Sequence, residues 1–96
     1  MIRTERETDR GLLVTVCDSD ALGETYERGE VSLEVTEAFY GGEEVEERDV
    51  LESLSRASVA NLVGTRSVEL AVEHGYVDAE RVLDLGETLH AQFLRL

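Results

Sequence analysis

The helical centre of this chain is expected in the stretch Asp49-Val-Leu-Glu-Ser-Leu-Ser-Arg-Ala-Ser-Val-Ala-Asn-Leu-Val-Gly64-Thr-Arg-Ser-Val-Glu-Leu-Ala-Val-Glu-His-Gly75. Its apolar residues recur at three- and four-residue spacing, which is typical of amphipathic helices. Asp49 and Glu52 have the spacing of a capping box, so we expect a helix to begin at Asp49. Gly64 interrupts the apolar stripe and suits the left-handed residue that follows a helix end. The stretch therefore predicts two helices with a tight break at Gly64, or one helix kinked there.

Strand-like segments flank this stretch on both sides. Residues 12–17 are apolar on both parities, which predicts a strand buried on both faces. Residues 31–37 alternate, so Val31, Leu33 and Val35 are expected to face a core. Residues 82–85 and 89–96 read as two strands joined by a turn at Gly86 and Glu87. We expect a short edge strand or a frayed end over residues 1–10, a helical turn over 21–27 and a single turn over 78–80.

Strands before and after a helical centre predict an α+β fold. We expect one domain over residues 1–96, in two layers, with the two central helices covering one face of a small, mostly antiparallel sheet.

Charge is the most informative bulk property of the chain. It has 22 acidic and nine basic residues, and its formal net charge is -13. Such an excess of acid is expected either of a protein that mimics nucleic acid or binds a basic partner, or of a cytoplasmic protein from a high-salt organism. The acids are scattered along the chain apart from one cluster over residues 43–47, and scattering favours the high-salt interpretation. No basic patch for nucleic acid, membrane-spanning run or signal peptide is apparent.

Few residues suggest catalysis. An enzyme that uses His90 with a nearby carboxylate or with Cys17 is the alternative to a binding function. A lone cysteine in an apolar strand is, however, usually an inert core residue. Asp18 and Asp20 have a spacing that suits a hard cation, but such spacings arise by chance in so acidic a chain. We therefore expect no catalytic residue, no metal site and no cofactor.

Two segments are candidate binding sites. Phe39, Tyr40, Gly41 and Gly42 place two aromatic rings on a connection, where they are either exposed anchors for a partner or, for Phe39, part of the core. His90 and Gln92 lie two residues apart on a predicted strand, so their polar side chains share one face.

A third candidate site surrounds the break at Gly64. Asn61 precedes the break, and Arg66 follows it in the first turn of the second predicted helix. A helix N-terminus attracts anions, and Arg66 adds a bidentate donor for carboxylate or phosphate. The alternative is that Asn61 and Arg66 satisfy only local carbonyls and carboxylates.

Several short segments, spread in order over nearly the whole chain, resemble one family. They are Val16-Cys17-Asp18, Leu22-Gly23, Phe39-Tyr40-Gly41-Gly42, Ala60-Asn61-Leu62-Val63-Gly64, Val68-Glu69-Leu70-Ala71 and His90-Ala91-Gln92. The chain is similar in them to the archaeal proteins grouped as "domain of unknown function 424". The resemblance implies an archaeal source and an association with translation, but no catalytic residue. A non-catalytic binding protein with a protein or ribonucleoprotein partner is the expected function.

The charge yields the first testable prediction. Carboxylates repel one another in dilute buffer, and molar salt shortens the screening length to about 3 Å. We expect the melting temperature to rise steeply between low and molar potassium or sodium chloride, measured by circular dichroism. A chaotropic sodium salt should also stabilise the protein at modest concentration, because the early gain comes from screening. A melting temperature that does not change with salt would contradict the high-salt interpretation.

Overall fold

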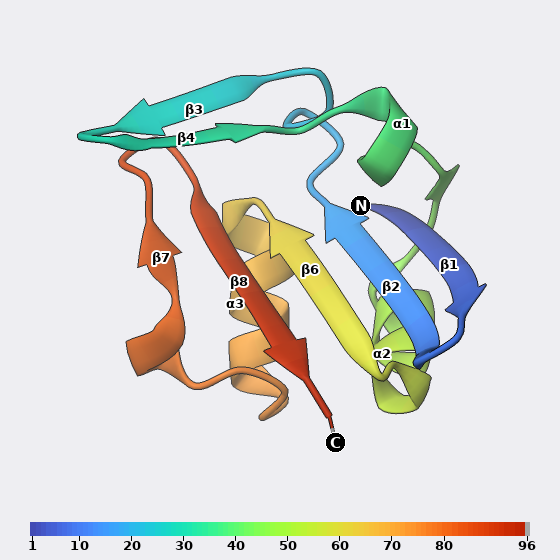
Figure 1. Ribbon diagram of the computed structural model, residues 1–96. Helices are drawn as coiled ribbons and strands as arrows, with labels where there is room; N and C mark the ends of the chain where they lie inside the picture. The colour runs from blue at the N-terminus through green and yellow to red at the C-terminus, as the bar shows by residue number, and fades with distance from the viewer. Residues whose placement is uncertain (96) are drawn as a thin grey trace.

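The computed structural model describes residues 1–95, and most of its strands form one mixed sheet. The order across this sheet is β5–β1–β2–β6–β8–β7 (Figure 1). The strands are β1 (Ile2–Thr8), β2 (Gly11–Cys17), β5 (Glu43–Glu44), β6 (Val59–Val63), β7 (Leu83–Asp84) and β8 (Leu89–Leu94). The pair β2–β6 is parallel and the other neighbouring pairs are antiparallel. The predicted mostly antiparallel sheet is therefore confirmed.

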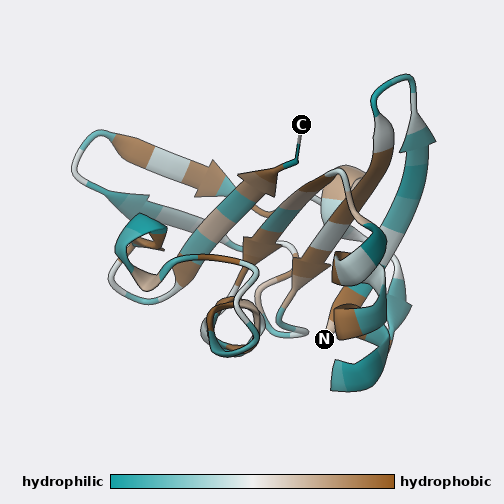
Figure 2. Ribbon diagram, turned by 90° about the horizontal axis from the view of Figure 1, so that it is seen from below, coloured by the Kyte–Doolittle hydropathy of each residue, from teal (hydrophilic) through white to brown (hydrophobic). Residues whose placement is uncertain are grey.

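Two helices cover one face of the sheet. Helices α2 (Glu47–Arg56) and α3 (Thr65–Glu73) lie behind the strands in Figure 1 and on one side of them in Figure 2. Their apolar residues pack on alternate residues of the central strands to form the main core. This core contains Leu12, Val14, Val16, Val50, Leu54, Ala57, Ala60, Leu62, Val68, Leu70, Ala71, Val77 and Ala91. The α+β class is confirmed.

Further elements cover part of the opposite face of the sheet, and the two-layer prediction did not include them. The hairpin of β3 (Thr25–Arg28) and β4 (Val31–Glu34) crosses one end of the strands, and the short helix α1 (Glu37–Tyr40) lies beside it (Figure 1). A second, smaller cluster lies under these elements and contains Ile2, Cys17, Ala21, Val35, Tyr40 and Val63. Among residues 1–95, no helix or strand lies in front of the remainder of this face (Figure 1).

The prediction that residues 59–63 continue a helix is wrong. They form β6, a strand between β2 and β8. Val59, Leu62 and Val63 have the spacing of a helix face, yet the segment is short and apolar on both parities. Because β6 is paired on both sides and its inner residues are buried, pairing and burial outweigh the helical spacing. The break is therefore a helix–strand–helix connection.

The start of α2 and the role of Gly64 also differ from prediction. Helix α2 begins after Glu46, whose N–H donates to Asp49 Oδ2 at 3.1 Å, so Asp49 is the third residue of a capping box and not its cap. Gly64 precedes α3 as its N-cap, with a φ of 117°, and does not follow a helix. It is indeed a position that favours glycine, but at the start of a helix.

The remaining predicted elements are partly confirmed. The turn over 78–80 is the 3-10 helix η1 (Ala79–Arg81), and β7 and β8 are the expected final strands, although residue 96 lies outside the described residues. Residues 21–27 were expected to be helical, but residues from Thr25 onward form β3. Val31 was expected to face a core, yet it is 41% exposed because the hairpin extends beyond the sheet. Across residues 1–95 no helix is both long and apolar enough to cross a membrane.

Gly64 gives a test of this architecture. An added Cβ would be strained at its positive φ and would also overlap the Asp18 carboxylate. We expect Gly64→Ala to lower the free energy of unfolding by about 2 kcal/mol or more. Gly75→Ala is the matched control, because Gly75 also has a positive φ but open space around it. Equal losses in the two variants, measured by denaturant unfolding, would show that the close approach of Asp18 is unimportant.

Candidate binding face

The uncovered part of the sheet carries one apolar row and one polar row. Strand register places Leu13, Val59 and Leu94 side by side across β2, β6 and β8. The next row on the same face is Thr15, Asn61 and Gln92, and His90 lies two residues further along β8. We call Leu13, Val59, Asn61, His90, Gln92 and Leu94 the open sheet face. Leu94 is 64% exposed, so the apolar row reaches solvent.

The residues of β1, β2, β6 and β8 on this side of the sheet include no acid, although Glu44 of the edge strand β5 lies on it opposite Ile2. Alternation along β1, β2, β6 and β8 directs to it Ile2, Thr4, Arg6, Thr8, Leu13, Thr15, Cys17, Val59, Asn61, Val63, His90, Gln92 and Leu94. The chain as a whole has 22 acidic residues among 96. β1 has acids on one side only: Glu5 and Glu7 point to the helix side, whereas Arg6 between them points to the other side. The open sheet face is therefore a neutral area on a strongly negative molecule.

Its polar side chains are available to a ligand. Within residues 1–95, the side chains of Asn61, His90 and Gln92 make no hydrogen bond or ion pair of their own. Thr15, in contrast, is fully buried and hydrogen-bonded to Thr4 at 2.5 Å. Two neighbouring amides can each donate and accept, which suits a polar partner surface or a peptide backbone.

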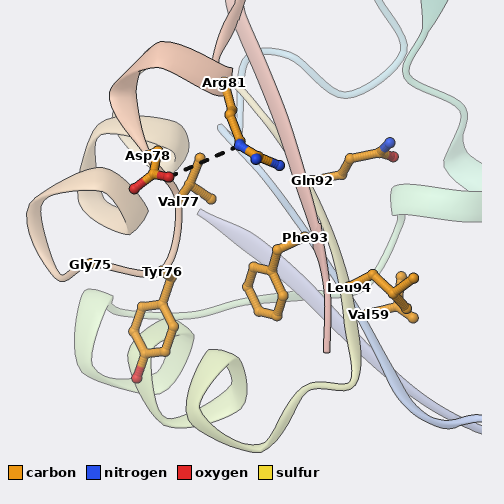
Figure 3. Close-up of a pocket in the computed structure, with 9 residues that line it drawn as sticks. All are labelled: Val59, Gly75, Tyr76, Val77, Asp78, Arg81, Gln92, Phe93 and Leu94. Carbon is orange, nitrogen blue, oxygen red and sulfur yellow. Dashed lines mark ion pairs between the residues drawn. The ribbon is translucent and has the colours of Figure 1, made fainter. Parts of the chain in front are cut away.

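A cavity adjoins the open sheet face where β8 ends. It has a volume of about 660 Å³ and lies between β8 and the loop that follows α3 (Figure 3). Its lining residues are Val59, Gly75, Tyr76, Val77, Asp78, Arg81, Gln92, Phe93 and Leu94. The rings of Tyr76 and Phe93 stack with centroids 6.2 Å apart, and the Arg95 guanidinium lies over both. Gln92 and Leu94 belong to both the cavity and the open sheet face.

The aromatic candidates are core residues rather than exposed anchors. Tyr40 is buried, and burial raises its pKa to about 12. Phe39 packs edge-on against Tyr40 and lies beneath the Arg6 guanidinium. Gly41 and Gly42 allow close backbone approaches, because a Cβ there would clash with the carbonyls of Glu37 and Arg3. This segment therefore closes the smaller core.

The candidates around the break at Gly64 do not form one site. Asn61 lies on the open sheet face, whereas Arg66 lies at the start of α3. The anion at that helix start is the chain's own Asp18, whose carboxylate accepts from Arg66 N–H at 3.1 Å and Ser67 N–H at 2.9 Å. The Arg66 guanidinium pairs with Glu47 at 3.4 Å. Local carboxylates thus occupy the donors proposed for a partner.

Cys17 and His90 are not brought together. They lie on β2 and β8, separated by β6, and two strand spacings amount to roughly 10 Å. Burial raises the pKa of the Cys17 thiol to about 11, so it is a poor nucleophile. Burial alone lowers the pKa of His90, and no carboxylate in the described chain hydrogen-bonds to it. The side chains described also include no cluster of three or more metal-ligating residues.

Sequence reasoning missed several members of this surface. Leu13 and Leu94 were assigned to strands without a face, and Val59 to the apolar face of a helix, because register cannot be read from one segment. Asp18 was considered as a turn or cap former and as a cation ligand, but not as the residue that caps the later helix α3. Its position directly after a buried strand was a signal for a polar role at the sheet edge.

Comparison with known proteins identifies relatives without an assigned activity. A family model described as "Protein of unknown function (DUF424)" matches residues 5–96. None of the curated proteins compared with the chain matches it. The crystal structure of an uncharacterized conserved protein from Methanopyrus kandleri is similar in fold, with a TM-score of 0.78 and 21% sequence identity. The match covers 99% of this chain and 92% of that one.

His90 gives a test that separates burial from catalysis. Burial disfavours the imidazolium, so we expect His90 to titrate below its usual value of 6.5. As the pH falls below 6.5, the imidazole of the unfolded chain takes up a proton before the buried imidazole of the folded protein does. Proton uptake therefore favours the unfolded state, and we expect the free energy of unfolding to fall. Two-dimensional NMR of the imidazole, assigned with His90→Gln, measures this pKa. A value above 6.5 would indicate a carboxylate or thiolate partner and would support the enzyme alternative.

Proposed function

The chain belongs to the DUF424 family of proteins of unknown function, and we propose that it is a non-catalytic binding protein whose partner covers the open sheet face. The observation that carries this proposal is the absence of acid from the residues of β1, β2, β6 and β8 on that side of the sheet, in a chain with net charge -13.

Interface chemistry explains why acids would be excluded there. A carboxylate covered by a partner loses its hydration, and this costs several kcal/mol unless the charge is paired. The cores of protein interfaces are accordingly depleted of Asp and Glu. An acid-free area with an apolar row, two free amides and a half-buried imidazole has the composition of such a core. The helix side of β1 shows that acids are otherwise accepted on these strands.

The partner we propose is a protein or a ribonucleoprotein of the translation machinery. The support is the association with translation that the sequence resemblance implies. A chain of net charge -13 would be repelled by phosphate groups. We therefore propose that the contact is made with a protein component rather than directly with RNA.

One substitution tests the face with little change of shape. Asn61→Asp keeps the size of the side chain but introduces a carboxylate at the centre of the open sheet face. We expect it to reduce the recovery of a translation-machinery partner from cells at native salt by about tenfold or more. Ser32→Asp is the matched control, because it adds the same charge on an exposed residue of the hairpin. Circular dichroism checks that both variants remain folded.

Two outcomes would contradict the proposal. If the folded Asn61→Asp variant recovers the same partners as the unchanged protein, the open sheet face is not the binding surface. If the unchanged protein recovers no ribosomal protein or translation factor, the proposed class of partner is wrong.

A further inference from the structure

The ladder between β7 and β8 stops early. β7 pairs with β8 only through Leu83 opposite His90 and Asp84 opposite Leu89. The Leu85 N–H continues this register by donating to Thr88 O at 2.9 Å. The next bonded pair in the other direction would join Arg81 to Gln92. The Arg81 N–H instead donates to Asp78 O at 2.9 Å within the turn of η1, so the ladder ends at His90.

The outer edge of β8 beyond His90 therefore lacks a strand partner. On the inner side, Gly64 N–H donates to Leu89 O and Arg95 N–H donates to Ser58 O. Because bonded pairs alternate in an antiparallel ladder, the odd-numbered residues of β8 direct their backbone groups to β6. Gln92 and Leu94 direct theirs to the opposite side, where no strand lies in the described part of the chain.

The cavity of about 660 Å³ lies along this edge. Figure 3 shows β8 on one side of it and the segment from Gly75 to Arg81 on the other. An added strand lies about 4.8 Å from its neighbour, so it would run within this space. Its side chains would point alternately towards the stacked Tyr76 and Phe93 and towards the side of the open sheet face. Aliphatic side chains suit both of these surroundings.

Charge distinguishes between the possible occupants. β8 has no acidic residue, but the molecule as a whole carries a net charge of -13. A second copy of the chain would bring two such charges together, whereas a segment with Lys or Arg would be attracted. Asp78 and Arg81 line the cavity as an ion pair 4.0 Å apart, so the attraction for a basic segment comes from the net charge of the molecule rather than from one carboxylate.

From these observations we propose that the edge of β8 at Gln92 and Leu94 is a strand-addition site. Its occupant is an extended segment of a partner protein, aliphatic in its centre and basic at its ends. Backbone hydrogen bonds to Gln92 and Leu94 provide the main recognition, as in other cases of strand addition. This inference rests on the proposed binding function and names the form in which the partner is recognised.

The first experiment uses defined peptides and the unchanged protein. The probe is the acetylated and amidated heptapeptide Arg-Val-Thr-Val-Thr-Val-Arg, titrated into ¹⁵N-labelled protein at the lowest salt at which it is folded. We expect shifts centred on the amides of Gln92 and Leu94. Replacing both arginines by glutamates, or methylating alternate backbone nitrogens that face β8, should weaken binding by about tenfold or more.

The second experiment changes the protein at one backbone donor. Leu94→Pro removes the N–H that faces the open edge, and proline is accepted where an edge N–H faces solvent. Leu94→Ala removes the same side chain but keeps the N–H, so it is the matched control. We expect the proline variant to bind the peptide at least about tenfold more weakly than the alanine variant, because both lose the leucine side chain and only proline also loses the N–H. The methylated peptide tests the same hydrogen bonds without a protein variant, should Leu94→Pro not fold.

The outcomes separate this inference from the proposed function. Equal binding of the methylated peptide, shifts located elsewhere, or no binding at millimolar peptide would overturn the strand-addition site. So would a dimer of the unchanged chain, seen by sedimentation, that Leu94→Pro abolishes, because the occupant would then be a second copy. If Asn61→Asp reduces partner recovery while Leu94→Pro does not, the binding function stands and this inference is wrong.

Discussion

The parallel pairing of β2 with β6 is the constraint on which the rest of the structure depends. It places Val14 and Val16 beside Ala60 and Leu62, all of them buried, at the centre of the sheet. A parallel connection needs a crossover, and the chain between these strands supplies the hairpin, α1, β5 and α2. It also brings the end of β2 beside the start of α3, so that Asp18 accepts the first N–H groups of that helix. This pairing thus places both helices: α2 lies in the crossover, and the first turn of α3 is held by Asp18 at the end of β2.

The sequence predicts most of what depends on local patterns. The buried strand β2, the amphipathic α2 and α3, and the final pair β7–β8 follow from periodicity, β-branched residues and turn glycines. The strand β6 does not, because Val59, Leu62 and Val63 match a helix face as well as a strand. Only its long-range partners decide between the two, and these are invisible in a single segment. The hairpin β3–β4 was half missed for the same reason, since its register depends on the turn at Gly29.

In the candidate site, too, the local patterns were predictable and the pairing of distant segments was not. His90 and Gln92 were found because strand alternation places them on one face, and Asn61 was singled out for its position near Gly64. That Asn61 lies opposite Gln92 is a consequence of register between β6 and β8. The aromatic pair at residues 39–40 and the donors at Arg66 proved to satisfy the fold itself. What remains is one surface, neutral on an acidic molecule, that ends at an incompletely paired strand.

The central claim is that this strand presents an open edge for a partner to complete. Amide hydrogen exchange along β8, followed by NMR in the free protein at stabilising salt, tests it most directly. The account predicts slow exchange at Ala91 and Phe93, whose N–H groups face β6, and exchange at least about tenfold faster at Gln92 and Leu94, whose N–H groups face the cavity. Equally slow exchange at all four amides would mean that the edge is already covered, and would contradict the account.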